Sequence, residues 1–89
     1  MRKIEQDLLN AIHNGRHVTL ANTAYNADTG VVTLHGHHIA TIDGNGRATA
    51  NRHTFALWPT RVTRSRLQAL GIDASIRNFT AVIDGEVCI

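Results

Sequence analysis

The sequence has few aromatic residues, one cysteine and no long apolar run, and each shortage limits what the protein can be. Four of its 89 residues are aromatic, so the core depends mainly on Val, Ile, Leu and Ala, and a partner subunit could help to complete it. The single cysteine, Cys88, cannot form an intramolecular disulfide, which fits a reducing cytoplasm. No run reaches the about 18 apolar residues of a membrane span, so we expect one cytoplasmic domain over residues 1–89.

Acidic residues are missing from the middle of the chain. Between Asp43 and Asp73 there is no Asp or Glu, whereas five arginines fall in this interval: Arg47, Arg52, Arg61, Arg64 and Arg66. The net charge is only +2, so the basic character is local. A local concentration of arginine favours an anionic partner, either nucleic acid or an acidic protein surface.

Apolar residues at helical spacing predict a helix over residues 2–14. Ile4, Leu8 and Ile12 lie on one face of such a helix, and the opposite face is polar. Gly15 is a natural residue to end it, because glycine adopts the left-handed conformation that often follows a helix. One side of this helix is therefore expected to pack on a sheet.

A second helix is predicted over residues 60–70, after Pro59. Thr63 is the preferred N-cap, because Val62 before it and Leu67 after it would then form a hydrophobic staple. The alternative start is one turn earlier, with Thr60 as the cap.

The remaining segments are typical of short antiparallel strands, because their apolar residues alternate and turn residues separate them. Strands are predicted for HVTLANTAY (17–25), VVTL (31–34), HHIATI (37–42), RATA (47–50), HTFALW (53–58) and a final hairpin, FTAVI and EVCI, that turns at Asp84-Gly85. The predicted fold class is therefore α+β. A curved antiparallel sheet, made of a meander plus the C-terminal hairpin, carries an N-terminal helix and a second helix near residues 61–70.

One turn is predicted in detail, at His35-Gly36. Two-residue hairpin loops need positive φ, which glycine supplies and histidine tolerates better than most residues. The resulting register opposes Leu34 to His37, Thr33 to His38 and Val32 to Ile39. The glycine-rich segment DGNG (43–46) is expected to be a second hairpin turn and not a phosphate-binding loop.

Three histidines lie around the first of these turns: His35, His37 and His38. Histidines at this spacing suggest a metal site, which would support a metal-dependent hydrolase. The turn takes His35 out of the strand, however, and Asp43 is the nearest carboxylate in sequence. We therefore predict histidines of a turn and a sheet surface, with no metal, no cofactor, no catalytic residue and no enzymatic activity.

The arginines at the start of the second helix are the strongest candidate for a binding surface. Cations near a helix N-terminus are disfavoured by roughly 0.3–1 kcal/mol each, so their placement is better explained if an anion binds there. The candidate binding residues are Arg61, Arg64, Arg66 and Thr63, with Arg47 and Arg52 on neighbouring strands in support. On this interpretation Arg66→Glu keeps or raises the stability of the protein. The alternative is a solvated helix start whose arginines pair with Asp or Glu elsewhere in the fold.

Trp58 is the best candidate for stacking on a nucleic-acid base. Because it stands beside Pro59, it is expected in the core instead. No helix-turn-helix is evident, so sequence-specific reading of nucleic acid is not expected.

Two motifs remain, LHGHHIA (34–40) and WPTRVTRSRLQAL (58–70). They resemble a Leu-His-Gly hairpin followed by Ile-Ala, and a Trp-Pro-Thr element leading into Thr-Arg-Ser-Arg-Leu, in a family of small proteins of tailed bacteriophages. The resemblance covers residues 3 to about 70, and His37 and Gln68 stand where the family pattern has asparagine. It implies a phage origin and no particular mechanism.

A phage origin favours a protein that acts during infection by binding. We therefore predict a small accessory protein of the host-cell cytoplasm that binds a host or anti-phage defence protein through its Arg-rich helix start. The alternative is non-specific nucleic-acid binding through the same arginines. A homodimer through the apolar strand EVCI (86–89) stays open, because an edge strand can pair with another copy.

Overall fold

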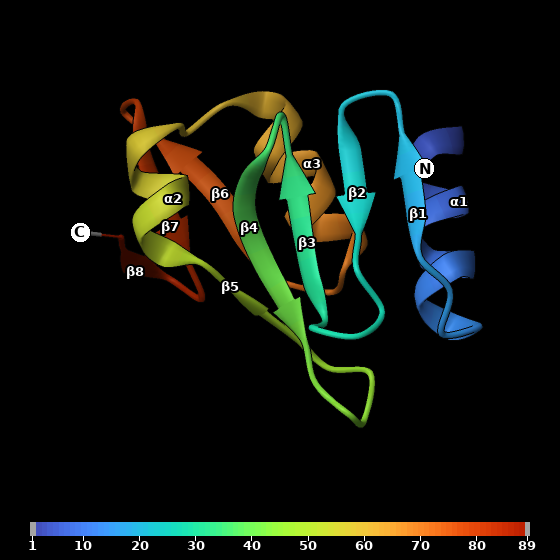
Figure 1. Ribbon diagram of the computed structural model, residues 1–89. Coiled ribbons are helices and arrows are strands. Elements are labelled where there is room, and N and C mark those ends of the chain that lie inside the picture. The colour runs from blue at the N-terminus through green and yellow to red at the C-terminus, as the bar shows by residue number, and fades with distance from the viewer. Residues whose placement is uncertain (1, 89) are drawn as a thin grey trace.

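The computed structural model describes residues 2–88 and contains three helices and eight strands within them (Figure 1). The elements follow in the order α1 (Lys3–His13), β1 (Val18–Leu20), β2 (Thr23–Tyr25), β3 (Val31–Leu34), β4 (His37–Ile42), β5 (Ala48–Ala50), α2 (Arg52–Leu57), α3 (Arg61–Ala69), β6 (Ala74–Arg77), β7 (Thr80–Ile83) and β8 (Glu86–Val87). The first five strands form one antiparallel sheet in chain order, and the last three form a second. The predicted α+β class is confirmed, with the C-terminal strands in a sheet of their own.

The helices join the two sheets. Helix α1 packs on β1 and β2, and α3 contacts α1, β4 and β6, so both helices cover one face of the five-stranded sheet (Figure 1). Helix α2 contacts β4 and β7 and thereby also connects the sheets. Each helix contributes a fully buried side chain to the core, namely Leu8 from α1, Phe55 from α2 and Leu67 from α3. Val32 and Ile39 meet them from the sheet.

The hairpin at His35-Gly36 forms as predicted. Both turn residues have positive φ, 53° and 80°, as the two-residue turn requires. Leu34 pairs with His37 and Thr33 with His38. The predicted pairing of Val32 with Ile39 is wrong, because a register shift at this point pairs Val32 with Ala40. The extra residue lets both Ile39 and Ala40 be buried in succession, which a regular strand would prevent.

Residues 17–25 form a hairpin and not one strand. The strands β1 and β2 pair through Leu20 and Thr23, and Ala21 between them has a φ of 38°. The carbonyl of Asn22 accepts a hydrogen bond of 2.7 Å from the amide of His35, which anchors this turn to the next hairpin. Alanine rarely occupies such a conformation, so a turn at this position could not be predicted from the residue type.

The segment HTFALW, predicted as a strand, forms the short helix α2. The side chain of Asn51 accepts a hydrogen bond of 3.2 Å from the amide of Thr54 and so caps the first turn. Phe55 then enters the core from the helix. Arg52 consequently lies at the start of a helix, and Arg47 lies in the turn before β5. The prediction that both lie on strands is therefore wrong.

The C-terminal segment forms three strands, one more than the predicted hairpin. Its turn at Asp84-Gly85 has φ values of 52° and 80°, as expected for a two-residue loop. Strand β6 was not predicted, and Phe79, predicted as a strand residue, lies instead in a turn with Asn78 and is 94% exposed. Strand β8 covers Glu86–Val87. Ile89, the last residue of the predicted strand EVCI, lies outside the described residues.

Candidate functional site

Arg66 is a buried structural residue and does not belong to an anion-binding surface. It is 3% exposed, and its Nη1 lies 2.7 Å from Oε2 of the equally buried Glu5 in α1. Its Nε donates to Oγ1 of Thr23 at 3.0 Å, and Nη2 donates to Oδ1 of Asn22 at 3.4 Å. Arg66 also lies in the last turn of α3, where the helix dipole favours a cation. The prediction that Arg66 faces an external anion is therefore wrong.

The hydroxyl groups proposed for the same anion site already have partners inside the protein. Thr60 is the N-cap of α3, with its Oγ1 accepting from the amide of Thr63 at 3.1 Å, so the alternative start is correct and the preferred cap at Thr63 is wrong. Thr63 is buried, and its hydroxyl bonds to that of Thr60 at 2.9 Å. Ser65 donates to Glu5. The hydroxyls of Thr60, Thr63 and Ser65 are thus engaged within the protein.

The four other predicted arginines lie on two separate surfaces. Arg61 is exposed and Arg64 is half-buried in the first turn of α3, and within residues 2–88 neither forms an ion pair. Arg47 and Arg52 line a groove near the other end of α3, beside Leu70. The arginines therefore do not form one continuous basic footprint.

Three residues before Arg61 in the chain, Trp58 takes part in an aromatic pair that the sequence did not predict. Trp58 is 44% exposed, so its predicted place in the core is wrong. Its ring stacks on that of His37, with ring centroids 4.1 Å apart and an interplanar angle of 25°. Next to the pair is a mainly apolar hollow of about 350 Å³ lined by Leu34, His35, His37, Ile39, Thr54, Trp58, Thr60, Val62 and Thr63. We call Trp58, His37, Arg61 and this hollow the Trp58 surface.

Local chain geometry explains why Trp58 faces outward. Helix α2 ends at Leu57, because Pro59 disfavours helical backbone at the residue before it. Trp58 takes an intermediate conformation, donates to the Thr54 carbonyl at 3.0 Å and accepts from the Thr60 amide at 2.9 Å. The tryptophan thus sits at the corner between two helices. The Trp-Pro pair followed by a capping threonine was the signal in the sequence for this corner.

The three clustered histidines do different things. His35 is in the turn, His37 stacks on Trp58, and Nε2 of His38 lies 2.7 Å from Oγ1 of Thr41. Across residues 2–88 there is no group of three or more His, Cys, Asp or Glu side chains that could hold a metal ion.

Burial raises the pKa of the Cys88 thiol, more than the nearby charge of Arg52 lowers it, so a reactive thiolate is disfavoured there.

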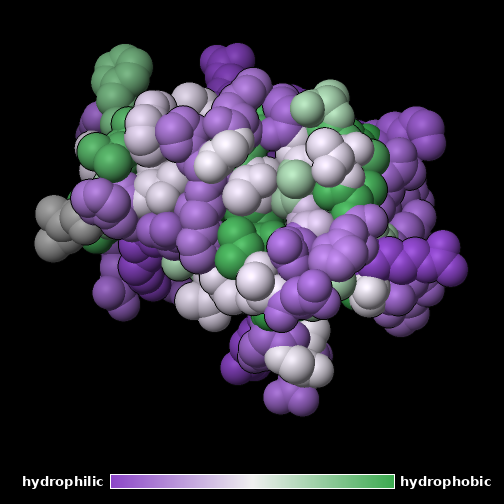
Figure 2. All heavy atoms as spheres, in the orientation of Figure 1, coloured by the Kyte–Doolittle hydropathy of each residue, from purple (hydrophilic) through white to green (hydrophobic). Residues whose placement is uncertain are grey.

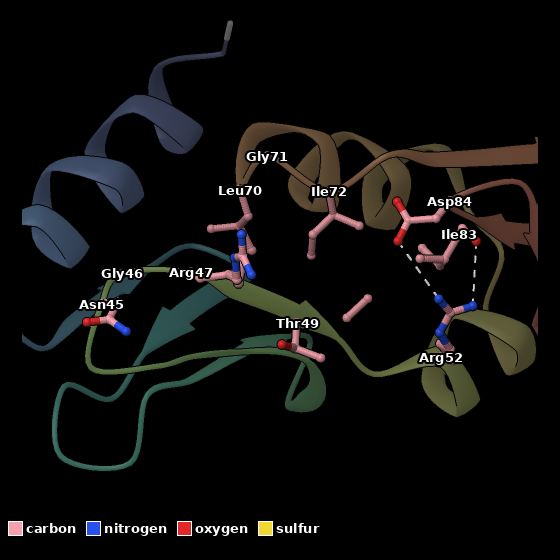
Figure 3. Close-up of a pocket in the computed structure, with 12 residues that line it drawn as sticks. Asn45, Gly46, Arg47, Thr49, Arg52, Leu70, Gly71, Ile72, Ile83 and Asp84 are labelled. Atoms are coloured by element: carbon pink, nitrogen blue, oxygen red, sulfur yellow. Dashed lines mark hydrogen bonds and ion pairs between the residues drawn. The ribbon is translucent and has the colours of Figure 1, made fainter.

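The groove with Arg47 and Arg52 is shown in Figure 3. It has a volume of about 490 Å³ and lies between strand β5 and the segment that follows α3. Leu70 and Ile72 form one wall, and Ile83 lies near the end occupied by Arg52. Arg52 donates to the Ile83 carbonyl at 3.5 Å and lies 3.9 Å from Asp84. We call this site the β5 groove. On the face seen in Figure 2, hydrophobic side chains reach the surface only in separate patches among hydrophilic residues.

These features define a small α+β protein with two antiparallel sheets, an exposed Trp58–His37 stack and a groove lined by Arg47 and Arg52. The chain belongs to the Kyanoviridae Gp96 protein family, whose model matches residues 1–88. This is a family of phage proteins, so the predicted membership of a small phage protein family is confirmed. No curated protein and no solved structure matches the chain. In the described part of the chain, no helix is both long and apolar enough to cross a membrane.

Proposed function

We propose that this phage protein is an accessory protein that acts by binding a protein of the host or of its anti-phage defence. The observation that supports this is the Trp58 surface. A tryptophan that is 44% exposed stacks on a histidine beside an apolar hollow, and the exposed Arg61 follows three residues later. Tryptophan, tyrosine and arginine are the residues most enriched among those that dominate protein–protein binding energy.

The Trp58 ring is a suitable anchor because a partner can still bury much of it. A tryptophan side chain contributes up to roughly 250 Å² of contact area, so covering its exposed part stabilises a complex by about 2–3 kcal/mol. The stack with His37 limits the motion of the ring before binding, which lowers the entropy lost on association. The adjoining hollow offers a place for an apolar side chain of the partner.

Arg61 and Arg64 give the proposed surface its charge preference. Both lie in the first turn of α3, where the positive helix end adds to their charge. An acidic surface on the partner would be attracted to them and oriented by them, mainly through a faster association rate. Arg66, buried against Glu5, has no part in this.

Non-specific nucleic-acid binding is the second candidate. The exposure of Trp58 supports it, because the sequence analysis expected this residue in the core. A stacked aromatic pair, with two arginines a few residues after Trp58 in the chain, offers a platform for an unpaired base. Against it stands the distribution of charge, because Arg47 and Arg52 lie in the β5 groove and do not continue the basic surface of α3. A phosphate backbone needs such continuity. We therefore place protein binding first.

The accompanying predictions follow from the same proposal. The protein acts in the cytoplasm of the infected cell, and it acts by binding and not by catalysis. A homodimer through strand β8 remains a separate prediction, for which the 58% exposed Val87 is the relevant side chain.

The test is affinity capture from a host-cell lysate, with and without nuclease, followed by affinity measurement on the purified captured molecule. We compare wild type with Trp58→Ala and with the double variant Arg61→Glu, Arg64→Glu, and use Phe79→Ala as the matched control, because Phe79 is an equally apolar exposed aromatic on another turn. The proposal expects a protein that survives nuclease, is lost with the first two variants and is kept by the control. Capture of nucleic acid alone, with steep loss in salt, would favour the second candidate.

A further inference from the structure

The backbone of β5 is paired on one side only. It is the last strand of the five-stranded sheet and pairs with β4. Two bonds fix its hydrogen-bond pattern: Asn51 donates to the carbonyl of Ile39 at 2.7 Å, and Asp43 donates to the carbonyl of Arg47 at 2.9 Å. Along a strand of an antiparallel pair, residues that hydrogen-bond to the partner strand alternate with residues whose N–H and C=O groups point away from that strand. Thr49, midway between Arg47 and Asn51, therefore also directs its N–H and C=O toward β4.

Ala48 and Ala50 must then direct their N–H and C=O groups outward, away from the sheet. In the described chain, residues 2–88, none of these four groups has a hydrogen-bond partner. Unpaired groups along a strand edge are the template on which another strand can add. Because both residues are alanines, little side-chain bulk hinders the approach of another backbone.

The β5 groove lies beside this edge. Ala48 and Ala50 are half-buried, whereas Thr49 between them is exposed, so the two alanines face the interior side of the strand. All three residues of β5 line the hollow of about 490 Å³, with Leu70 and Ile72 across from the strand (Figure 3). In an added strand, the residues opposite the two alanines would point their side chains into the same hollow. Their side chains would be apolar, to match its walls.

The arginines at the two ends of the β5 edge indicate which kind of strand would bind there. Arg47 precedes β5 and forms no ion pair within residues 2–88. Arg52 follows β5, with Asp84 3.9 Å away and the Ile83 carbonyl accepting its hydrogen bond at 3.5 Å. An added strand with carboxylates near its ends would neutralise both arginines. A second copy pairing through its own β5 would instead bring four arginines to one seam with no carboxylate on either strand. The charges therefore favour a different, acidic segment over self-association.

We infer that the β5 groove binds an extended segment of a partner protein by strand addition. The segment pairs its backbone with Ala48 and Ala50, places two apolar side chains in the hollow and carries a carboxylate near each end for Arg47 and Arg52. This site shares no residue with the Trp58 surface, so either proposal can fail without the other.

The test uses a synthetic blocked hexapeptide, Glu-Thr-Val-Thr-Val-Glu, in which the two valines fall opposite the two alanines. Its binding to the whole protein is followed by NMR, as chemical-shift change and as slowed hydrogen exchange of the Ala48 and Ala50 amides. Two matched peptides serve as controls: one with lysine at both ends, and one with both valine amides methylated. We expect slowed exchange at both alanines with the first peptide, roughly fivefold weaker binding of the lysine peptide and loss of binding on methylation.

A charge reversal in the protein completes the test. Arg47→Glu should move the preference from the glutamate peptide toward the lysine peptide, and Arg61→Glu, on the Trp58 surface, should leave it unchanged. Three results would overturn the inference: no effect at Ala48 and Ala50 with millimolar peptide, equal binding of the methylated peptide, or slowed exchange at these amides that rises with protein concentration and needs no peptide. The last would assign the edge to a second copy of this chain.

Discussion

Nη1 of Arg66 lies 2.7 Å from Oε2 of Glu5, and both side chains are buried between α1 and α3. The two residues are separated by 61 positions in the chain, and the pair ties the first helix to the third. Ser65 and Thr23 add hydrogen bonds to the carboxylate and the guanidinium. An arginine that looked like a surface contact is thus part of the core.

The first prediction concerns the stability of this ion pair. Arg66→Met should lower the free energy of unfolding by about 3–5 kcal/mol, because the Glu5 carboxylate would remain buried without its partner. The double variant Arg66→Met, Glu5→Leu should cost clearly less than the sum of the single changes. Urea unfolding gives these values, with Arg61→Met as the control that stays within about 0.5 kcal/mol of wild type. An equal loss in both arginine variants would contradict the structural role of Arg66.

The second prediction concerns acid stability. Burial raises the pKa of Glu5, but the hydrogen bonds from Ser65 and Arg66 and the charge of Arg66 lower it more, so the pKa is below its ordinary value in the folded state. A depressed carboxyl pKa stabilises the fold above the unfolded value, about 4.3, and this contribution is lost as pH falls through the folded pKa. Glu5→Gln should therefore be less stable than wild type at neutral pH, with a difference that shrinks below about pH 4. A difference independent of pH, measured by urea unfolding between neutral and acid pH, would show that Glu5 does not titrate in this way.

The third prediction compares two glycines with nearly the same positive φ. Gly30 and Gly36 have φ values of 77° and 80°, but a Cβ at Gly30 would collide with the carbonyl of Ile42, whereas at Gly36 nothing lies within 4 Å. Gly36→Ala should cost about 1 kcal/mol for its positive φ. Gly30→Ala should cost at least about 3 kcal/mol, because the backbone hydrogen bond between Ile42 and Gly30 must also shift. Thermal unfolding of the two variants measures the difference, and similar melting temperatures would contradict the close approach.

The fourth prediction separates binding from folding at Trp58. Because Trp58 is 44% exposed, Trp58→Ala should lower the free energy of unfolding by only about 1–2 kcal/mol, less than the about 3–5 kcal/mol typical of a buried tryptophan. The affinity for the captured partner should fall by about 2 kcal/mol or more, roughly thirtyfold. Phe79→Ala, at a 94% exposed position, should change neither quantity. A loss of about 3–5 kcal/mol in the free energy of unfolding would show that Trp58 has a structural role instead.

Local signals predicted much of the fold. The helix Lys3–His13 follows from its apolar spacing, and the turns His35-Gly36 and Asp84-Gly85 follow from the need for positive φ. The helix Arg52–Leu57 was missed because Thr, Phe and Trp in this segment are residues enriched in strands, whereas the deciding feature is the cap made by Asn51. The asparagine is visible in the sequence, and weighting it as an N-cap would have located the helix.

The candidate site was harder to predict, because exposure depends on residues that are distant in the chain. Arg61 and Arg66 belong to the same helix, and nothing in the local sequence separates them. Glu5 and Thr23 hold Arg66 in the core, whereas Arg61 is exposed. The stack of Trp58 on His37 likewise depends on how α2 packs against β4. The two motifs that suggested a phage protein meet at this stack, which periodicity could not show.

The central claim is that the Trp58 surface contacts another protein in the infected cell, and site-specific photo-cross-linking tests it most directly. A photoreactive phenylalanine analogue replaces Leu57, which neighbours Trp58 and is 56% exposed, or Phe79 as the control position. The account predicts one discrete protein adduct from position 57, lost in the Trp58→Ala background, and none from position 79. No protein adduct at position 57, or the same adducts at both positions, would contradict it.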